Sequence, residues 1–540
     1  MAKPARSLLS LWRASSRASC ASLTSWALLA ACVSAAIGLR FYAIDHLPGI
    51  NGDEPQYAVH AHAFFDGAKL SSLRTGSDLP MNPAFFGTVV VLQKLLPQTF
   101  WTLRLSAVVL SLATITLAWV LFRQRGAMFA ATFACLVAAL PIHLGYARFA
   151  WDPTAIPTVS VLALAASARG RALWTLAAWL LCLWVHPTTV FLAPCLAAPF
   201  LARLGARAAL GVLALPLMAA VAYLGLEGDW LPGAVANVLR GDLSAAARAR
   251  ALDPAQLGSF LLAYLELLSG PTIYRYITGS LSRRAGQLHL ALSLALVLPL
   301  LAAGLCAAAR RRRTLDLATA LGWLVSVLLL YLLAGPVAVE PKTERYAVCL
   351  TVPACYVLST CIDALATTGV RARWLRIALS LLGGALLVSF CTHYLHRLER
   401  PDSAREDAFR SGEIEPKLQA LRAVAALRDP AKLPLIYVED WWIYWPVRYL
   451  ATSSSELAAR VTIFNRPWHH FFPRDFELPR YEPARMERFG VAWAGHRLDA
   501  SFARFADAQR EIYGYGPDPI LRVYKLRGLP ERKLRRARGR

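Results

Sequence analysis

Residues 287–309 read QLHLALSLALVLPLLAAGLCAAA, an apolar run without an ionised side chain. A helix needs about 20 such residues to cross the hydrocarbon core of a bilayer, with a range of roughly 17 to 25. Comparable runs recur up to residue 393, and of the 540 residues 56% are hydrophobic and only 17% charged. A soluble globular protein is about half apolar and a quarter charged. Residues 1–393 are therefore predicted to form an all-α polytopic membrane domain.

Eleven runs are candidate membrane-spanning helices. The N-terminal run superficially resembles a signal peptide, but it continues to Phe41, which favours an uncleaved first helix. The runs at 153–168, 172–186 and 188–202 are short for a bilayer crossing. The full set lies at 23–43, 101–122, 127–147, 153–168, 172–186, 188–202, 208–226, 287–309, 315–335, 345–367 and 374–392.

Basic residues cluster in short gaps between these runs, on one side of the predicted membrane domain. The gaps hold no acidic residue, whereas the opposite side carries Asp and Glu, and basic loops stay cytoplasmic. The N-terminus is thus predicted inside, with large loops at 44–100 and 227–286 outside. No eukaryotic sorting signal is recognisable, which favours a bacterial inner (plasma) membrane. The net charge of +24 then indicates contact with membrane lipids and no nucleic-acid partner. The basic gaps lie at 123–126, 168–171, 202–207, 310–313 and 370–373.

Residues 394–540 have the composition of an ordinary mixed domain. Two stretches, 405–427 and 441–450, are typical of helices, and their alternation with strands predicts a small α/β soluble domain with a basic tail. An odd number of spans places this domain outside the cell membrane. Short strands are predicted at 434–438, 461–464, 491–493 and 520–524.

The end of the first of these strands is rich in polar and aromatic residues. Glu439 and Asp440 lie where α/β sheets often bind ligands, although a turn or cap role is the simpler interpretation. Trp441, Trp442 and Trp445 follow, and they could form a sugar-stacking or membrane-facing surface or pack in the core.

The segment 48–57 reads PGINGDEPQY and follows the first predicted helix on the outer side. Its glycines permit a tight turn, and Pro55 suits the first turn of a helix that Asp53 would cap. A cap and a favourable charge at a helix start would account structurally for Asp53 and Glu54. The other interpretation is that two carboxylates at the membrane surface serve a reaction.

Further polar residues recur near the outer ends of later runs. Each also has a purely structural interpretation. Arg104 would contact lipid headgroups, and Arg148 would pair with Asp152. His186 would be an ordinary loop residue, and the residues around Arg345 would anchor a helix at the membrane interface. Ionisable groups at membrane depth are costly, however, and usually paired or functional. The candidate site residues are therefore Arg104, Arg148, Asp152, His186, Lys342, Arg345 and Tyr346.

In order and spacing, these residues resemble the membrane-embedded GT-C glycosyltransferases. The similar branch includes protein O-mannosyltransferases, the aminoarabinose transferase acting on lipid A and bacterial lipopolysaccharide sugar transferases. The resemblance runs from the first predicted helix to about Pro353. It is carried by Asp53-Glu54 with Tyr57, Leu79-Pro-Met-Asn-Pro83, Arg104, Arg148 with Asp152, and Glu344-Arg345-Tyr346.

The resemblance implies a GT-C fold of about 11 transmembrane helices with interfacial or re-entrant helices in the first outer loop. It implies inverting transfer of a hexose or pentose from a polyprenyl-phosphate donor to a hydroxyl of a lipid, glycan or protein. Asp53 is then expected to be the general base, and Glu54 to orient it or hold the acceptor. The substrate-binding residues implied are Tyr57, Asp152, His186 and Tyr346, with Arg104, Arg148, Lys342 and Arg345 as candidates for the leaving phosphate.

The sequence departs from this family in its first outer loop. Several relatives carry Lys-Pro-Pro there, with a lysine that meets the donor phosphate, whereas Leu79-Pro-Met-Asn-Pro83 has none. Another cation, such as Lys342, would have to replace it. The outer segments hold no Asp-X-Asp sequence and the ten cysteines have no metal-ligand spacing, so no obligatory metal or cofactor is expected. Residues 439–442, Glu-Asp-Trp-Trp, nearly match the Trp-Trp-Asp motif of oligosaccharyltransferases, and we expect this to be coincidence.

A polytopic transporter or a flippase for lipid-linked glycans is the alternative class. Transporters often show internal repeats or broken helices near the midplane. This sequence shows no repeat, and its ionisable residues gather at one face of the membrane domain, which favours the transferase.

Overall fold

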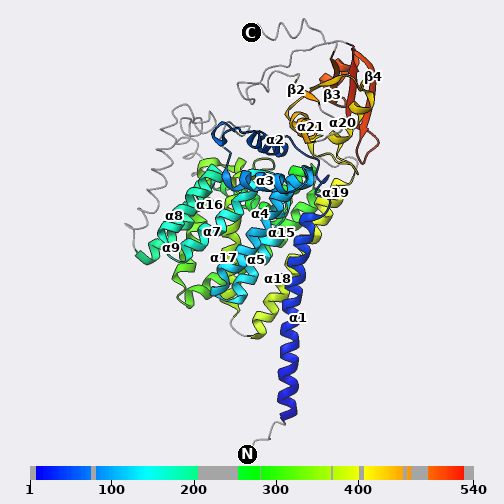
Figure 1. Ribbon diagram of the computed structural model, residues 1–540. Helices are drawn as coiled ribbons and strands as arrows, with labels where there is room; N and C mark the ends of the chain where they lie inside the picture. The colour runs from blue at the N-terminus through cyan, green and yellow to red at the C-terminus, as the bar shows by residue number, and fades with distance from the viewer. Residues whose placement is uncertain are drawn as a thin grey trace, which may run out of the picture.

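A computed structural model describes residues 8–73, 81–204, 253–279, 281–366, 369–400, 407–453, 459–463 and 485–527. It consists of a large helical body and a small domain containing a β-sheet, which lies beyond one end of the body (Figure 1). Helix α1 (Leu8–Phe41) begins on the opposite side of the body from that domain (Figure 1).

Among the described residues, six helices are long and apolar enough to cross a membrane. A helix satisfies all its interior backbone groups within itself, as lipid requires. The six coincide with six of the predicted spans. They lie at Leu23–Phe41 in α1, Phe100–Arg125 around α4 (Phe100–Phe122), Arg283–Arg310 (α15), Thr314–Ala334 (α16), Val348–Leu365 around α17 (Thr351–Leu365) and Val370–Leu398 around α18 (Gly369–Phe390).

The remaining predicted spans are occupied by shorter helices. Residues 127–147 are divided at Pro141, which cannot donate a helical hydrogen bond, and the next three predicted spans each hold one helix too short to cross a bilayer alone. The span predicted at 208–226 lies outside the described residues, so the number of crossings stays a prediction. The shorter helices are α5 (Ala127–Ala139), α6 (Pro141–Tyr146), α7 (Ile156–Ala168), α8 (Ala172–Val185) and α9 (Ala193–Leu204).

Within the described residues, the loop predicted to lie outside at 44–100 contains two α-helices that lie across the end of the helical body, as expected of interfacial helices (Figure 1). These are α2 (Asp53–Phe65) and α3 (Pro83–Leu95), and the ring of Tyr57 meets the edge of Phe85 with 4.8 Å between centroids. The described part of the loop at 227–286 contains α13 (Pro254–Ser269), followed by α14 (Pro271–Thr278).

The C-terminal domain holds one five-stranded sheet in the order β2-β1-β3-β5-β4. Strand β1 is parallel to β2 and β3, and β5 is antiparallel to β3 and β4. Strand β4 was not predicted, because its sequence ADAQREIY is polar and it forms the exposed edge of the sheet. The strands are β1 (Leu433–Val438), β2 (Arg460–Ile463), β3 (Met486–Trp493), β4 (Ala506–Tyr513) and β5 (Pro519–Leu526).

Three helices accompany this sheet: α20 (Pro416–Leu427), α21 (Trp441–Ser453) and α22 (Arg497–Ala503). The long helix predicted from residue 405 is therefore shorter than expected. Its start is delayed to Pro416, because Gly412 packs against the backbone of Gly514 and the chain turns there.

The C-terminal domain packs directly on the first outer loop. Helix α21 lies against α2, and the hydroxyl of Tyr449 donates to Gln93 Oε1 at 3.2 Å. The Gly49 N–H donates to the Phe409 carbonyl at 3.0 Å, and a Cβ on Gly49 would lie 2.3 Å from the Arg410 carbonyl oxygen. Only glycine permits this approach, which seats the segment before Asp53 against the C-terminal domain.

Candidate active site

The start of helix α2 is capped by Asn51 and not by Asp53. The Asn51 Oδ1 accepts hydrogen bonds from the backbone N–H groups of Asp53 at 3.0 Å and Glu54 at 3.2 Å. Asp53 is the first residue of the helix, so it cannot be the cap, which precedes the first helical residue. The expected cap role of Asp53 is thus wrong. Its carboxylate is partly exposed, and Oδ1 accepts from Trp441 Nε1 at 3.1 Å.

Glu54 and Arg104 form a two-point ion pair with both side chains 0% exposed. Arg104 Nε donates to Glu54 Oε2 and Nη2 to Oε1, each at 2.8 Å. Arg104 Nη1 also donates to the carbonyls of Ile44 and Pro48. The Ala150 N–H donates to Glu54 Oε2 at 2.9 Å. The pair joins α2, α4 and the segment before α7, and breaking such a buried pair typically costs about 3–5 kcal/mol.

The expected roles of these two residues were different, since Glu54 was placed beside Asp53 or the acceptor and Arg104 on the phosphate. The structure brings the two residues to each other, 50 positions apart in the chain. The two residues form a buried ion pair in which Glu54 directly follows Asp53 in the sequence, and the expected role of Glu54 in orienting Asp53 or holding the acceptor stays a prediction.

Tyr57 and Asp152 lie beside Asp53. A hydrogen bond joins the Tyr57 hydroxyl to the Asp152 carboxyl, and the charges of Asp53 and Arg345 both act on Asp152. Burial raises the pKa of Asp152 to about 7 and Asp53 adds to the rise, while the Tyr57 hydrogen bond and Arg345 oppose it. Near neutral pH, Asp152 can therefore hold or release a proton. Three elements thus bring together Asp53, Tyr57, Asp152 and Arg345.

Arg345 is held between aromatic rings just before α17. Its guanidinium lies over the rings of Trp151 and Tyr346, 5.2 and 5.4 Å from their centroids. Burial lowers the pKa of Arg345, but Tyr346, Tyr146 and the Asp53 carboxylate outweigh that effect and raise it. The site thus contains a permanent cation within the electrostatic reach of Asp53.

Lys342 and His186 lie at the edge of this group. Lys342 is exposed and has a backbone φ of 88°, in the left-handed region. His186 Nδ1 and Thr188 Oγ1 share a hydrogen bond at 2.7 Å, and the His186 ring lies 6.3 Å from that of Tyr346. His186 thus packs behind Tyr346, which lies under the Arg345 guanidinium.

Arg148 is fully buried and faces away from Asp152. Its Nη1 donates to the Leu39 carbonyl at 2.7 Å and its Nη2 to the Leu47 carbonyl at 2.8 Å. These bonds tie the segment before α7 to the end of α1 and the start of the outer loop. Arg148 therefore neither pairs with Asp152 nor faces the cation site, and its role in holding phosphate stays a prediction without geometric support.

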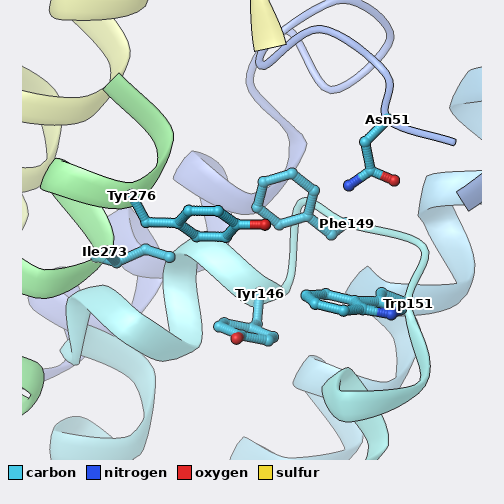
Figure 2. A pocket seen from close by; sticks show the side chains of 6 residues that line it. All are labelled: Asn51, Tyr146, Phe149, Trp151, Ile273 and Tyr276. Atoms are coloured by element: carbon cyan, nitrogen blue, oxygen red, sulfur yellow. The ribbon is translucent and has the colours of Figure 1, made fainter. Parts of the chain in front are cut away.

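A small aromatic pocket lies next to this group of residues (Figure 2). The rings of Tyr146 and Trp151 stack with 5.9 Å between centroids and an interplanar angle of 5°. Tyr276 of α14 faces them from the second outer loop, and Asn51 lies at the opposite side of the pocket (Figure 2). Trp151 lines the pocket and the Arg345 guanidinium lies over its ring, so the cation borders the pocket.

Glu344 lies beneath the pocket and gives a pH-dependent prediction. Its side chain is buried, Oε1 accepts from the Tyr146 hydroxyl at 3.1 Å, and burial raises its pKa to about 7. The unfolded chain loses this proton near pH 4.5, so ionisation favours unfolding increasingly between pH 4.5 and 7. We expect Glu344→Gln to raise the Tm measured at pH 8 and to leave it almost unchanged at pH 4.5.

The size of the Glu344 pKa shift limits the stabilisation by Glu344→Gln at pH 8 to about 3 kcal/mol. Thermal unfolding of detergent-purified protein at the two pH values measures it. An equal Tm change at both pH values would contradict a buried, protonated Glu344.

Sequence reasoning did not identify several residues of the site. Asn51 carried a readable signal, because Asn is a preferred helix cap whose side chain accepts from N–H groups two or three residues later. Tyr146, Trp151 and Tyr276 stand in apolar stretches where an aromatic residue is ordinarily part of the core. Trp441 was considered for an aromatic surface, for the core and within a motif similarity taken for coincidence, but not as a partner of Asp53.

No family model matches the chain, and no curated protein sequence matches it. A crystal structure of ArnT from Cupriavidus metallidurans bound to undecaprenyl phosphate superposes with a TM-score of 0.51 at 13% sequence identity. The superposition covers 93% of this chain and 98% of that one. The chain shares the fold of ArnT.

This likeness confirms the predicted fold, an all-α polytopic membrane domain with a small C-terminal α/β domain. The apo state of the same ArnT gives a TM-score of 0.40 at 15% identity, with 93% of this chain and 98% of that one covered.

Proposed function

We propose that this protein is an inverting glycosyltransferase that moves a sugar from a polyprenyl-phosphate donor to an acceptor hydroxyl at the outer face of the membrane. The observation that carries the proposal is that a partly exposed carboxylate, Asp53, lies within electrostatic reach of a guanidinium, Arg345, beside a group of aromatic residues. The fold shared with an ArnT that was crystallised with undecaprenyl phosphate supports the choice of donor.

Asp53 acts as the general base in this proposal. A sugar or lipid hydroxyl is a poor nucleophile, and a positioned carboxylate contributes about 10²- to 10⁴-fold by taking its proton. The acceptor oxygen attacks the anomeric carbon, the bond from that carbon to the phosphate oxygen breaks, and the acceptor proton moves to Asp53. A single displacement inverts the anomeric centre, so no covalent intermediate with the protein is needed.

Arg345 stabilises the departing polyprenyl phosphate. Negative charge grows on the phosphate as the bond breaks, and a cation placed beforehand stabilises it without reorganisation. The aromatic rings of Trp151 and Tyr346 restrict the guanidinium, and exposed Lys342, three residues earlier, is a second cation for the same phosphate. These residues replace the lysine that the first outer loop lacks.

We place the sugar ring of the donor against the aromatic residues beside Arg345. Aromatic faces such as Trp151 pack against the C–H groups of a pyranose, while Asn51 supplies polar contacts at the opposite side. Asp152 and Tyr57 can hydrogen-bond sugar or acceptor hydroxyls, and Asp152 changes its charge near neutral pH. His186 and Tyr346 support this arrangement from behind.

The chemistry proposed here needs no metal, because Arg345 takes the place of a divalent cation at the phosphate. We place the reaction at the extracytoplasmic face of a bacterial inner membrane, with the C-terminal domain on that side and the N-terminus in the cytoplasm. The acceptor is a hydroxyl of a lipid, a glycan or a protein.

A reconstituted transfer assay tests the function. Proteoliposomes would receive undecaprenyl-phosphate sugars labelled in the sugar, together with lipid extract from the source membrane, and the label would be followed into product. We expect label to leave the carrier and to appear on the acceptor through a new glycosidic bond with inverted configuration. Movement of intact donor between leaflets without bond cleavage would instead establish a flippase and contradict the proposal.

A further inference from the structure

The C-terminal domain reaches the proposed base through one corner of its sheet. Strand β1 ends at Val438, and Glu439 and Asp440 follow directly before α21. Asp440 Oδ1 accepts from the Ile443 N–H at 3.1 Å, which caps α21, and Oδ2 accepts from Trp493 Nε1 at 2.7 Å. Glu439 Oε2 accepts from the Trp493 N–H at 3.1 Å. The cap role considered for Asp440 is thereby confirmed, and the corner is held by three hydrogen bonds.

Trp441 extends from this corner onto the start of α2. Its side chain is 5% exposed, and its Nε1–H donates to Asp53 Oδ1 at 3.1 Å across 388 positions of sequence. A Cβ at Gly52 would lie only 2.3 Å from Trp441 Cδ1 and 2.6 Å from its carbonyl oxygen. The glycine directly before Asp53 thus lets the indole pack flush against the backbone that carries the carboxylate.

A second contact fixes the indole from behind. The ring of Trp445, one turn later on α21, meets that of Trp441 at 5.4 Å and an angle of 74°. Trp445 in turn packs against His60 of α2 at 5.8 Å. The Trp441 ring is therefore packed between α21 and α2, and its N–H points to Asp53.

We infer that Trp441 is a positioning residue for the base, so that the C-terminal domain completes the active site of the membrane domain. This inference rests on the proposed function. One N–H donor on Oδ1 fixes the rotation of the carboxylate and favours its ionised form, which is the form that accepts a proton.

Other groups act on the same carboxylate from neighbouring elements. Tyr57 lies one turn along α2, Asp152 lies before α7, and Arg345 lies before α17. Arg345 also favours the ionised form of Asp53, whereas Asp152 opposes it when charged. The contribution of Trp441 must therefore be measured by removing its N–H alone.

Trp441→Phe is the first test, with Trp442→Phe as the matched control on the partly exposed neighbour. We expect Trp441→Phe to lower kcat by roughly 10- to 100-fold, the usual effect of losing a hydrogen bond to a charged group. The acid limb of the pH–rate profile should move upward by about one pH unit, because Asp53 loses a donor to its ionised form. The KM for the donor should stay nearly constant, and Trp442→Phe should behave like wild type in all three quantities.

A residue that only docks the two domains would give a different result. Its loss would lower the Tm and the amount of active protein without moving the pH profile. Incorporation of 3-benzothienylalanine at position 441 replaces the ring N–H with sulfur at constant shape, so the measurement stands even where Trp441→Phe fails to fold. We expect it to reproduce the reduced kcat and the shifted acid limb.

The two proposals fail separately. A benzothienylalanine protein with wild-type kcat and pH profile, beside an inactive Asp53→Asn protein, would overturn the role of Trp441 and leave the transferase intact. An active Asp53→Asn protein would overturn the base itself, and with it the inference for Trp441.

Discussion

Replacement of Asp53 with Asn is expected to lower transfer by roughly 10²- to 10⁴-fold, the contribution of a positioned general base. Asn keeps the size of the side chain and an oxygen that can accept from Trp441 Nε1, so the geometry is preserved while the proton acceptor is lost. The rate of label transfer under saturating donor measures the effect. Because Asn51 caps α2, the helix start should be unaffected and the Tm should stay within the range of wild type.

The control for Asp53 is Asp45→Asn in the same outer loop. Asp45 has 59% of its side chain exposed and pairs with His46 at 2.9 Å. Its loss removes one negative charge from the same region without touching the site, so transfer should remain at the wild-type rate. Comparable losses in both variants would mean that the loop requires negative charge in general and that Asp53 is not the base.

Replacement of Arg345 with Ala is expected to lower kcat by about 10²- to 10³-fold, the usual cost of losing one donor to a developing anion. Arg345→Lys keeps the charge but loses the planar group stacked on Trp151 and Tyr346, so it should recover only part of the rate. Lys342→Ala should have a smaller effect, because Lys342 is exposed and its charge is screened by water. Single-turnover rates with labelled donor measure all three variants.

Thermal unfolding provides the control for Arg345, since its ring contacts also contribute to packing. A lower Tm together with a proportional loss of active protein would indicate a structural role. A wild-type rate per folded molecule in Arg345→Ala would exclude this guanidinium from the leaving-phosphate site.

The membrane helices could be predicted because their signal is local. Residues 287–309 predict a span by length and apolarity alone, and Pro55 indicated that a helix starts near Asp53, although the cap was assigned to the wrong residue. Strand β4 could not be predicted, because it is a mostly exposed edge strand whose polar sequence ADAQREIY contains no hydrophobic run.

The candidate site was predictable in its members but not in its pairings. Asp53, Asp152 and Arg345 were singled out by charge at the ends of apolar runs, and the structure brings them together. The pairing of Glu54 with Arg104 depends on how two helices cross, which one sequence without relatives does not reveal. The contact of Trp441 with Asp53 depends on domain docking, and no local pattern records it.

The most direct measurement compares wild-type and Asp53→Asn protein in matched proteoliposomes supplied with labelled undecaprenyl-phosphate sugars and acceptor lipid extract. We expect wild type to form labelled product with inverted configuration and Asp53→Asn to form almost none at equal expression and Tm. Equal product from the two proteins would contradict the assignment of Asp53 as the base on which the proposed mechanism depends.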